Sequence, residues 1–262
     1  MEAGSLEAVL GRDRMVLGVG LVAVLVMAWG WLVTGAGMEM SAVEMTSMAG
    51  MDGWLMRPAV WTPAYAVLIF AMWWVMMVAM MLPSAAPMLL LFARVSRKDK
   101  PAGAPLVLTA LFAAGYLLGW GSFCAVATAL QWGLESARLL SPMLVTTNPW
   151  LGAGILIAAG LSQFTPLKSV CLRHCRTPLG FLLGSWRSGR LGALRMGLEH
   201  GAFCLGCCWF LMALLFFGGV MNLYWIVGLA VFVLLEKTIP LGHWLSRVAG
   251  IVLVVWGGVL VN

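Results

Sequence analysis

The sequence predicts an all-α fold, a polytopic transmembrane helical bundle of about seven spans with a cytoplasmic N-terminus. Hydrophobic residues make up 62% of the 262 positions and charged residues only 10%, whereas a soluble domain carries roughly 25% charged residues. Apolar stretches long enough to cross a hydrocarbon core of about 30 Å recur along the chain. These two observations exclude a soluble globular protein.

The spans are the apolar stretches between charges, because roughly 20 helical residues cross the bilayer. We expect them at residues 15–35, 63–92, 106–131, 150–166, 192–218, 223–235 and 248–261. The fourth and sixth are short. The first is expected to be a retained anchor, because its apolar run exceeds the roughly 7–15 residues of a signal-peptide core.

A single domain follows from this pattern. Residues 1–14 are expected to form a cytoplasmic N-terminal segment, residues 15–262 one transmembrane helical domain, and residues 36–60 approximately a methionine-rich external loop. No internal repeat is evident, which argues against a transporter built from inverted repeats.

Basic residues set the expected orientation. They fall in alternate loops of a seven-span chain, and the positive-inside rule places those loops in the cytoplasm and the C-terminus outside. The net charge of +6 is therefore interpreted as loop charge beside the lipid bilayer, and no nucleic-acid partner is expected. The residues concerned are Arg12, Arg14, Arg94, Arg97, Lys98, Lys100, Lys168, Arg173, Arg176, Arg187, Arg190, Lys237 and Arg247.

The fifth span carries a stripe of soft donor side chains. Its members recur every three or four residues, so they share one helical face, and thiols and imidazole in hydrocarbon are costly unless something binds them. They are Met196, His200, Cys204, Cys207, Cys208 and Met212. Metal ligation is the favoured interpretation, and simple packing is the alternative. The isolated Cys124 is expected only to pack.

A second cluster, Cys171, His174 and Cys175, follows Pro166, which should end or kink the fourth helix. A hairpin turning near residues 180–189 would put Cys171 level with Met196. The two clusters then form either one shared metal site or a shallow site that hands an ion to a deeper one. The alternative without a metal site is a cytoplasmic loop whose cysteines are free thiols with no function.

Glu199 and Arg195 lie one helical turn apart on the fifth span. Either a structural ion pair or a proton-handling carboxylate would account for Glu199. Glu236 and Lys237 close the sixth span, where a neighbouring acid and base are expected to anchor the helix at the membrane interface.

Methionines add a further set of soft donors. Met72, Met76 and Met80 form one stripe on the second span, with Met77 and Met81 beside it and Pro83 and Pro87 beyond; a metal path and plain packing both remain open. The external loop adds Met38, Met40, Met45, Met48 and Met51, which could capture metal because no core is expected there.

The donor set selects the metal. Cys, Met and His favour copper(I) first and zinc second, whereas the scarcity of carboxylates in the spans argues against calcium and magnesium. Structural disulfides are not expected in the cytoplasmic half of a membrane protein.

Four motifs carry a family resemblance: AMMLPSAAPM, QFTPLKSVCLRHCRTPLGF, HGAFCLGCCW and LLEKTIP. Over about residues 64–250 the chain resembles an uncharacterised bacterial family of predicted metal-binding integral membrane proteins. The resemblance implies metal binding, which we carry to Cys171, Cys175, His200, Cys204, Cys207 and Cys208.

The leading hypothesis is a bacterial inner-membrane protein that binds a soft transition metal and moves or delivers it, with no catalytic residue. A partner subunit or a metallochaperone would then exchange metal with it. The alternatives are an assembly subunit of a larger membrane complex and a membrane thiol oxidoreductase that uses Cys204–Cys207 or Cys207–Cys208. The redox alternative is ranked lower, because these thiols are expected mid-helix without a nearby cation.

Overall fold

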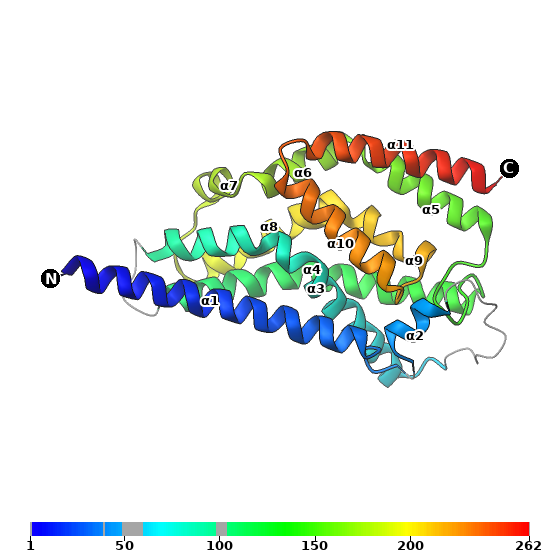
Figure 1. Cartoon of the computed structure of the whole chain (residues 1–262), viewed down its shortest axis with the longest axis horizontal. Coiled ribbons are helices and arrows are strands. Elements are labelled where there is room, and N and C mark those ends of the chain that lie inside the picture. Colours follow the sequence, from blue (N-terminus) through cyan, green and yellow to red (C-terminus); the bar gives the residue numbers. More distant parts are fainter. Residues whose placement is uncertain (1, 39, 49–59, 98–103, 262) are drawn as a thin grey trace.

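The computed structural model describes residues 2–38, 40–48, 60–97 and 104–261, and the regular elements within them are helices apart from one bridge between Leu140 and Thr146. The longer helices run roughly along the long axis of the molecule (Figure 1). The all-α prediction is confirmed. The helices are α1 (Glu2–Val33), α2 (Ala42–Ser47), α3 (Pro63–Ser96), α4 (Ala104–Ser136), α5 (Pro149–Ser162), α6 (Pro166–Arg176), α7 (Pro178–Ser185), α8 (Gly189–Ala213), α9 (Leu215–Gly218), α10 (Leu223–Thr238) and α11 (Gly242–Leu260).

Within the described residues, five helical segments are long and apolar enough to span a membrane, and the bent pair α5 and α6 raises the number to six. The five lie in α1, α3, α4, α8 with α9, and α11. The sequence predicts about seven spans; the remaining segment, α10, is helical but has only 16 residues. A helix of that length rises about 24 Å, less than the thickness of the hydrocarbon core.

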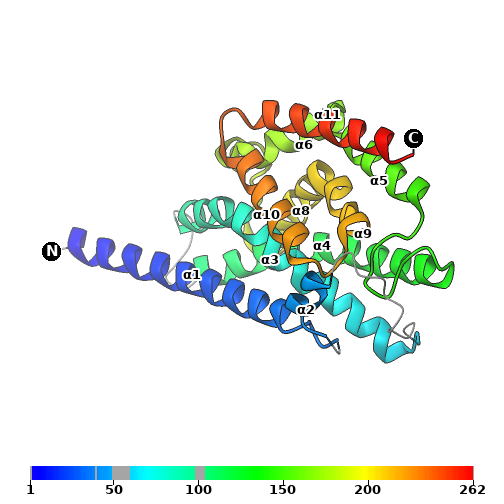
Figure 2. The same ribbon diagram turned by 45° about the vertical axis from the view of Figure 1, so that its right-hand side comes forward.

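Helix α1 is continuous from Glu2, so the expected cytoplasmic segment extends the first span rather than standing apart from it. Over Met15–Val33 the helix is strongly apolar and only 11% of its hydrophobic window is buried. It packs on α3 along one side, as the two views in Figures 1 and 2 show. An apolar helix with so little protein contact suits a lipid-facing position.

The short helix α2 lies in the segment predicted as an external loop. Ser41 and Glu44 form a capping box, and the Ser41 side-chain and backbone hydrogen bonds hold the pKa of Glu44 below its ordinary value. Thr46 accepts a hydrogen bond from the Leu223 backbone at the start of α10. Met45 is buried against the core, so the expectation that this loop has no core to fill is wrong for Met45.

Helices α4 and α8 approach each other through glycines. A Cβ on Gly115 of α4 would lie 2.1 Å from the Leu194 carbonyl oxygen, and one on Gly197 of α8 would lie 2.0 Å from the Phe112 carbonyl oxygen. Small residues let membrane helices pack backbone to backbone. The contact fixes the position of α8 along the axis of α4.

This close contact makes Gly115→Ala a strongly destabilising change. The added methyl meets backbone that cannot move aside, so we expect a loss of about 1–3 kcal/mol in the free energy of unfolding in detergent. Gly121→Ala on the same helix is the control, since no atom lies within 4 Å of its Cβ position and alanine is a better helix former by roughly 0.5–1 kcal/mol. Equal unfolding midpoints for the two variants would contradict the glycine contact.

The break between α5 and α6 positions the second cysteine cluster. The two helices meet at an angle of 63°. Thr165 caps α6 by accepting a hydrogen bond from the Lys168 backbone, and Pro166 occupies the first turn. The predicted interruption at Pro166 is confirmed. α5 packs against α11, whereas α6 packs against α8.

Candidate metal site

The donor stripe of α8 faces the interior of the bundle, and its side chains are at most 3% exposed. Cys204, Cys207 and Cys208 lie at its centre. The thiols of Cys207 and Cys208 each donate to the Cys204 carbonyl oxygen at 3.0 Å, an oxygen one turn back along the helix. These bonds bring three sulfur atoms to one stretch of α8.

Helix α6 brings a fourth sulfur to this stretch. The Cys175 thiol lies beside those of Cys204 and Cys207. Cys171 lies against Gly206, whose Cβ position is 2.7 Å from the Cys171 sulfur. Cys171 is therefore not level with Met196 as predicted, because α6 bends onto α8 and α7 lengthens the connection. We call Cys175, Cys204, Cys207 and Cys208 the thiol cluster.

Cys204 contacts two residues that sequence reasoning did not assign to the metal site. The Tyr116 hydroxyl of α4 lies 3.1 Å from the Cys204 sulfur. The Lys237 ammonium of α10 donates to the same sulfur at 3.0 Å and to the Ser84 hydroxyl at 3.2 Å. Lys237 is only 8% exposed, so the expectation that it anchors the helix at the interface is wrong. From the sequence, the redox alternative ranks lower because no cation is expected near these thiols. The Lys237 ammonium is such a cation.

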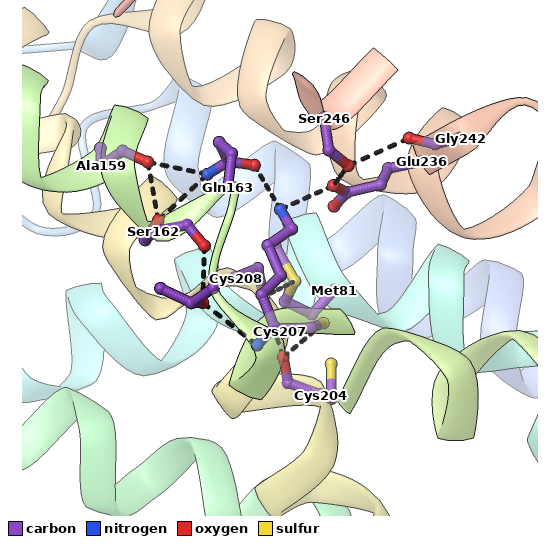
Figure 3. Close-up of polar contacts among 12 residues, drawn as sticks. Met81, Ala159, Ser162, Gln163, Cys204, Cys207, Cys208, Glu236, Gly242 and Ser246 are labelled. Atoms are coloured by element: carbon purple, nitrogen blue, oxygen red, sulfur yellow. Dashed lines mark hydrogen bonds and ion pairs between the residues drawn. The ribbon is translucent and has the colours of Figure 1, made fainter. Parts of the chain in front are cut away.

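A methionine of α3 completes the surroundings of the cluster. The Met81 sulfur lies 3.9 Å from the Cys208 sulfur, a contact drawn in Figure 3. Met72, Met76 and Met80 are buried in the same core. The thioether beside the cluster therefore comes from the neighbouring stripe of Met77 and Met81.

A buried ion pair lies next to the thiol cluster. The Lys168 ammonium of α6 contacts a Glu236 carboxylate oxygen at 2.6 Å, with side chains 4% and 0% exposed. Gln163 accepts from the same ammonium, and Ser246 of α11 donates to Glu236 (Figure 3). The second Glu236 oxygen is buried without a hydrogen-bond partner. Glu236 is thus a structural link between α6, α10 and α11, not the interfacial anchor predicted for it.

Both histidines of the predicted sites lie against aromatic rings. His200 lies among the rings of Phe112, Tyr116 and Phe181, with centroids 5.5–6.0 Å away, and its Nδ1 is buried without a partner. Tyr116 links His200 to the thiol cluster by touching both. His174 stacks on Phe203 at 4.1 Å. Its Nδ1 faces the Val170 carbonyl oxygen at 2.9 Å, and a carbonyl oxygen can only accept this hydrogen bond.

The remaining predicted residues are spread over the bundle. Glu199 pairs with Arg187 at 2.9 Å and with Arg195 at 3.5 Å, so the ion pair proposed for it is formed. Met196 belongs to a separate core cluster around Phe92, whereas Met212 packs in the main core. Cys124 is buried in the main core. Met51 lies outside the described residues.

All six cysteines are free thiols. In this conformation, no three His, Cys, Asp or Glu side chains of the described part of the chain form a group that could hold one metal ion. Zinc sites normally take four such ligands. Methionine is not one of those four residue types, so a site that includes a thioether is a separate case. Thiolates together with thioethers are ligands that select copper(I).

The fold and the site together define a class: a polytopic helical membrane protein with a buried cluster of thiols and a thioether, the donor chemistry of soft metal ions. Residues 70–260 match the PpoB2 family, described as copper chaperones, and because this match covers most of the chain, the protein belongs to that family. No curated protein and no solved structure matches the chain.

Family membership confirms the expectation of a membrane protein that handles copper. It agrees with the metal-binding character implied by the motifs and narrows the metal to copper. Zinc, the second metal expected, gains no support.

Proposed function

We propose that the protein is a copper(I) carrier of the bacterial inner membrane, which binds the ion at the thiol cluster and passes it to a partner. Two thiols of the cluster, that of Cys204 and one neighbour, would hold the ion, and the Met81 thioether would contribute a further soft ligand. Cys171 and His174 would receive copper from the cytoplasmic side, which the positive-inside rule assigns to the α6 end of the bundle.

The observation that carries this proposal is the convergence of sulfur from three helices. Cys175 comes from α6, Cys204 and Cys208 from α8, and Met81 from α3. Thiols gathered from separate helices inside a membrane core are costly to leave unbound. Copper(I) is the ion whose preferred ligands match the set.

Buried methionines around the thiol cluster would give the ion a route away from it. Beyond Met81, the main core contains further buried methionines on α3, together with Met212, Met221 and Met45. Copper(I) can exchange between thioethers without meeting water. Met196, which the sequence also suggested for this route, packs in the other core cluster.

The proposal predicts that purified protein retains copper(I) through the thiol cluster. Protein in detergent and reductant should keep about one copper(I) per chain against a weak chelator, since the cluster offers one set of soft ligands. A variant with serine at all four cluster positions should keep none. Metal analysis after desalting measures both.

Cys124→Ser is the matched control, because Cys124 is equally buried but lies on α4 and is not one of the four thiols of the cluster. It should retain as much copper as the wild type. Negligible copper in the wild type would remove the proposed function.

Thiol–disulfide chemistry is the second candidate, and the contact between Lys237 and Cys204 favours it. A cation beside a thiol promotes the reactive thiolate. This candidate predicts a reversible disulfide between cluster cysteines in cells. Trapping only free thiols in cells, together with copper retention by the purified protein, would reject it. A copper-free protein that co-purifies with a stoichiometric partner would instead indicate an assembly subunit.

A further inference from the structure

Lys237 is a buried cation that pairs with no carboxylate among the residues the structure describes. Its ammonium donates to the Cys204 sulfur and to the Ser84 hydroxyl. A lysine near the end of a membrane helix normally extends its amino group to the interface. Lys237 points inward instead, so its position requires a partner in the core.

The other acidic side chains that the structure describes are engaged elsewhere. Glu236 pairs with Lys168, Glu199 with two arginines, and Glu135 accepts from Trp61 and Gln131. Glu44 caps α2. A buried ammonium needs a compensating negative charge, and the Cys204 sulfur is the group placed to supply it.

We propose that the Lys237 ammonium makes the thiol cluster selective for a monovalent over a divalent soft cation. This inference rests on the proposed function and adds the property that separates copper(I) from zinc.

The charges balance for one ion and not for the other. Copper(I) held by two thiolates carries a net charge of −1, which the ammonium cancels. Zinc held by two thiolates is neutral and leaves the ammonium uncompensated. Three thiolates would balance zinc, but no three Cys, His, Asp or Glu side chains are arranged to share an ion in the described part of the chain.

The hydrogen bond acts in the same direction as the charge. The ammonium occupies one side of the Cys204 sulfur, which reduces the space for further ligands around a bound ion. A low coordination number suits copper(I) better than zinc, which takes four ligands in structural sites.

The test is the ratio of copper(I) to zinc affinities in Lys237→Met. Without the ammonium, copper(I) loses its compensating charge and zinc no longer faces an uncompensated one. We expect the ratio to fall by about 10- to 100-fold, the range for losing an outer partner of a metal ligand. Competition of the purified, reduced protein with chelators of known affinity measures both constants.

Two further variants distinguish charge from hydrogen bonding and from general effects. Lys237→Gln keeps an N–H donor without the charge, so its ratio should fall most of the way to that of Lys237→Met. It provides the same test if the methionine variant does not fold. Arg176→Met removes a cation at the same end of α10, where the guanidinium binds the Ile239 and Pro240 carbonyls, and should leave the ratio unchanged.

An unchanged ratio in Lys237→Met, or a wild-type ratio in Lys237→Gln, would overturn the inference. Either result can occur while the wild type still binds copper(I), so the proposed function would survive it. A wild type that binds no copper would reject the proposed function itself.

Discussion

Replacing Cys204 by serine is expected to lower the copper(I) affinity more than any other single thiol substitution. Cys204 is the sulfur on which the Tyr116, Lys237 and Cys175 contacts converge. Its loss removes a ligand and also leaves the Lys237 ammonium without its sulfur partner. The decrease should exceed the roughly 100-fold upper end for loss of an outer partner, as measured by chelator competition.

Cys171→Ser is the comparison for this prediction. Cys171 lies against Gly206, at the edge of the thiol cluster, so its replacement should change the affinity much less. If the Cys171 and Cys204 variants lost affinity equally, the two cysteine motifs would form a single site centred elsewhere than on Cys204.

Lys168→Met is expected to destabilise the protein by about 3–5 kcal/mol, because it leaves the Glu236 carboxylate buried without its ion-pair partner. Both side chains are almost fully buried and link α6 to α10. Unfolding in detergent, followed by circular dichroism, measures the change.

The double variant Lys168→Met with Glu236→Leu should recover most of that stability, since removing a whole buried ion pair is often nearly neutral. Arg195→Met is the exposed control. It breaks one contact of Glu199 at the surface, where an ion pair contributes about 0–1 kcal/mol. Equal destabilisation by Lys168→Met and Arg195→Met would show that the buried pair is not a structural link.

Local patterns in the sequence predicted much of this structure. Spacings of three and four along α8 predicted that Cys204, Cys207 and Cys208 share a buried face, because helical periodicity depends only on neighbouring residues. Length and composition predicted the membrane helices in the same way. Pro166 marked the start of a new helix.

The partners of the cysteines could not be predicted in this way. Tyr116, Met81 and Lys237 reach Cys204 or Cys208 from three other helices, and such contacts depend on how the helices pack. The glycines of α4 and α8 set one part of that packing, but a glycine spacing alone does not say which helix is the neighbour. A lysine in the last turn of a hydrophobic helix has the same sequence pattern whether it points to the interface or inward. The inward choice for Lys237 depends on the position of Cys204.

The depth of the sulfur atoms also governs how fast metal can exchange. Three of the four cluster thiols, those of Cys204, Cys207 and Cys208, are at most 3% exposed, so a chelator in solution cannot touch them while the bundle is closed. Copper bound at the proposed site would therefore have to enter and leave during transient openings of the bundle. Opening of this kind is a local event with its own free energy, so the residence time of the ion is set by a motion of the protein as well as by the strength of its bonds to sulfur.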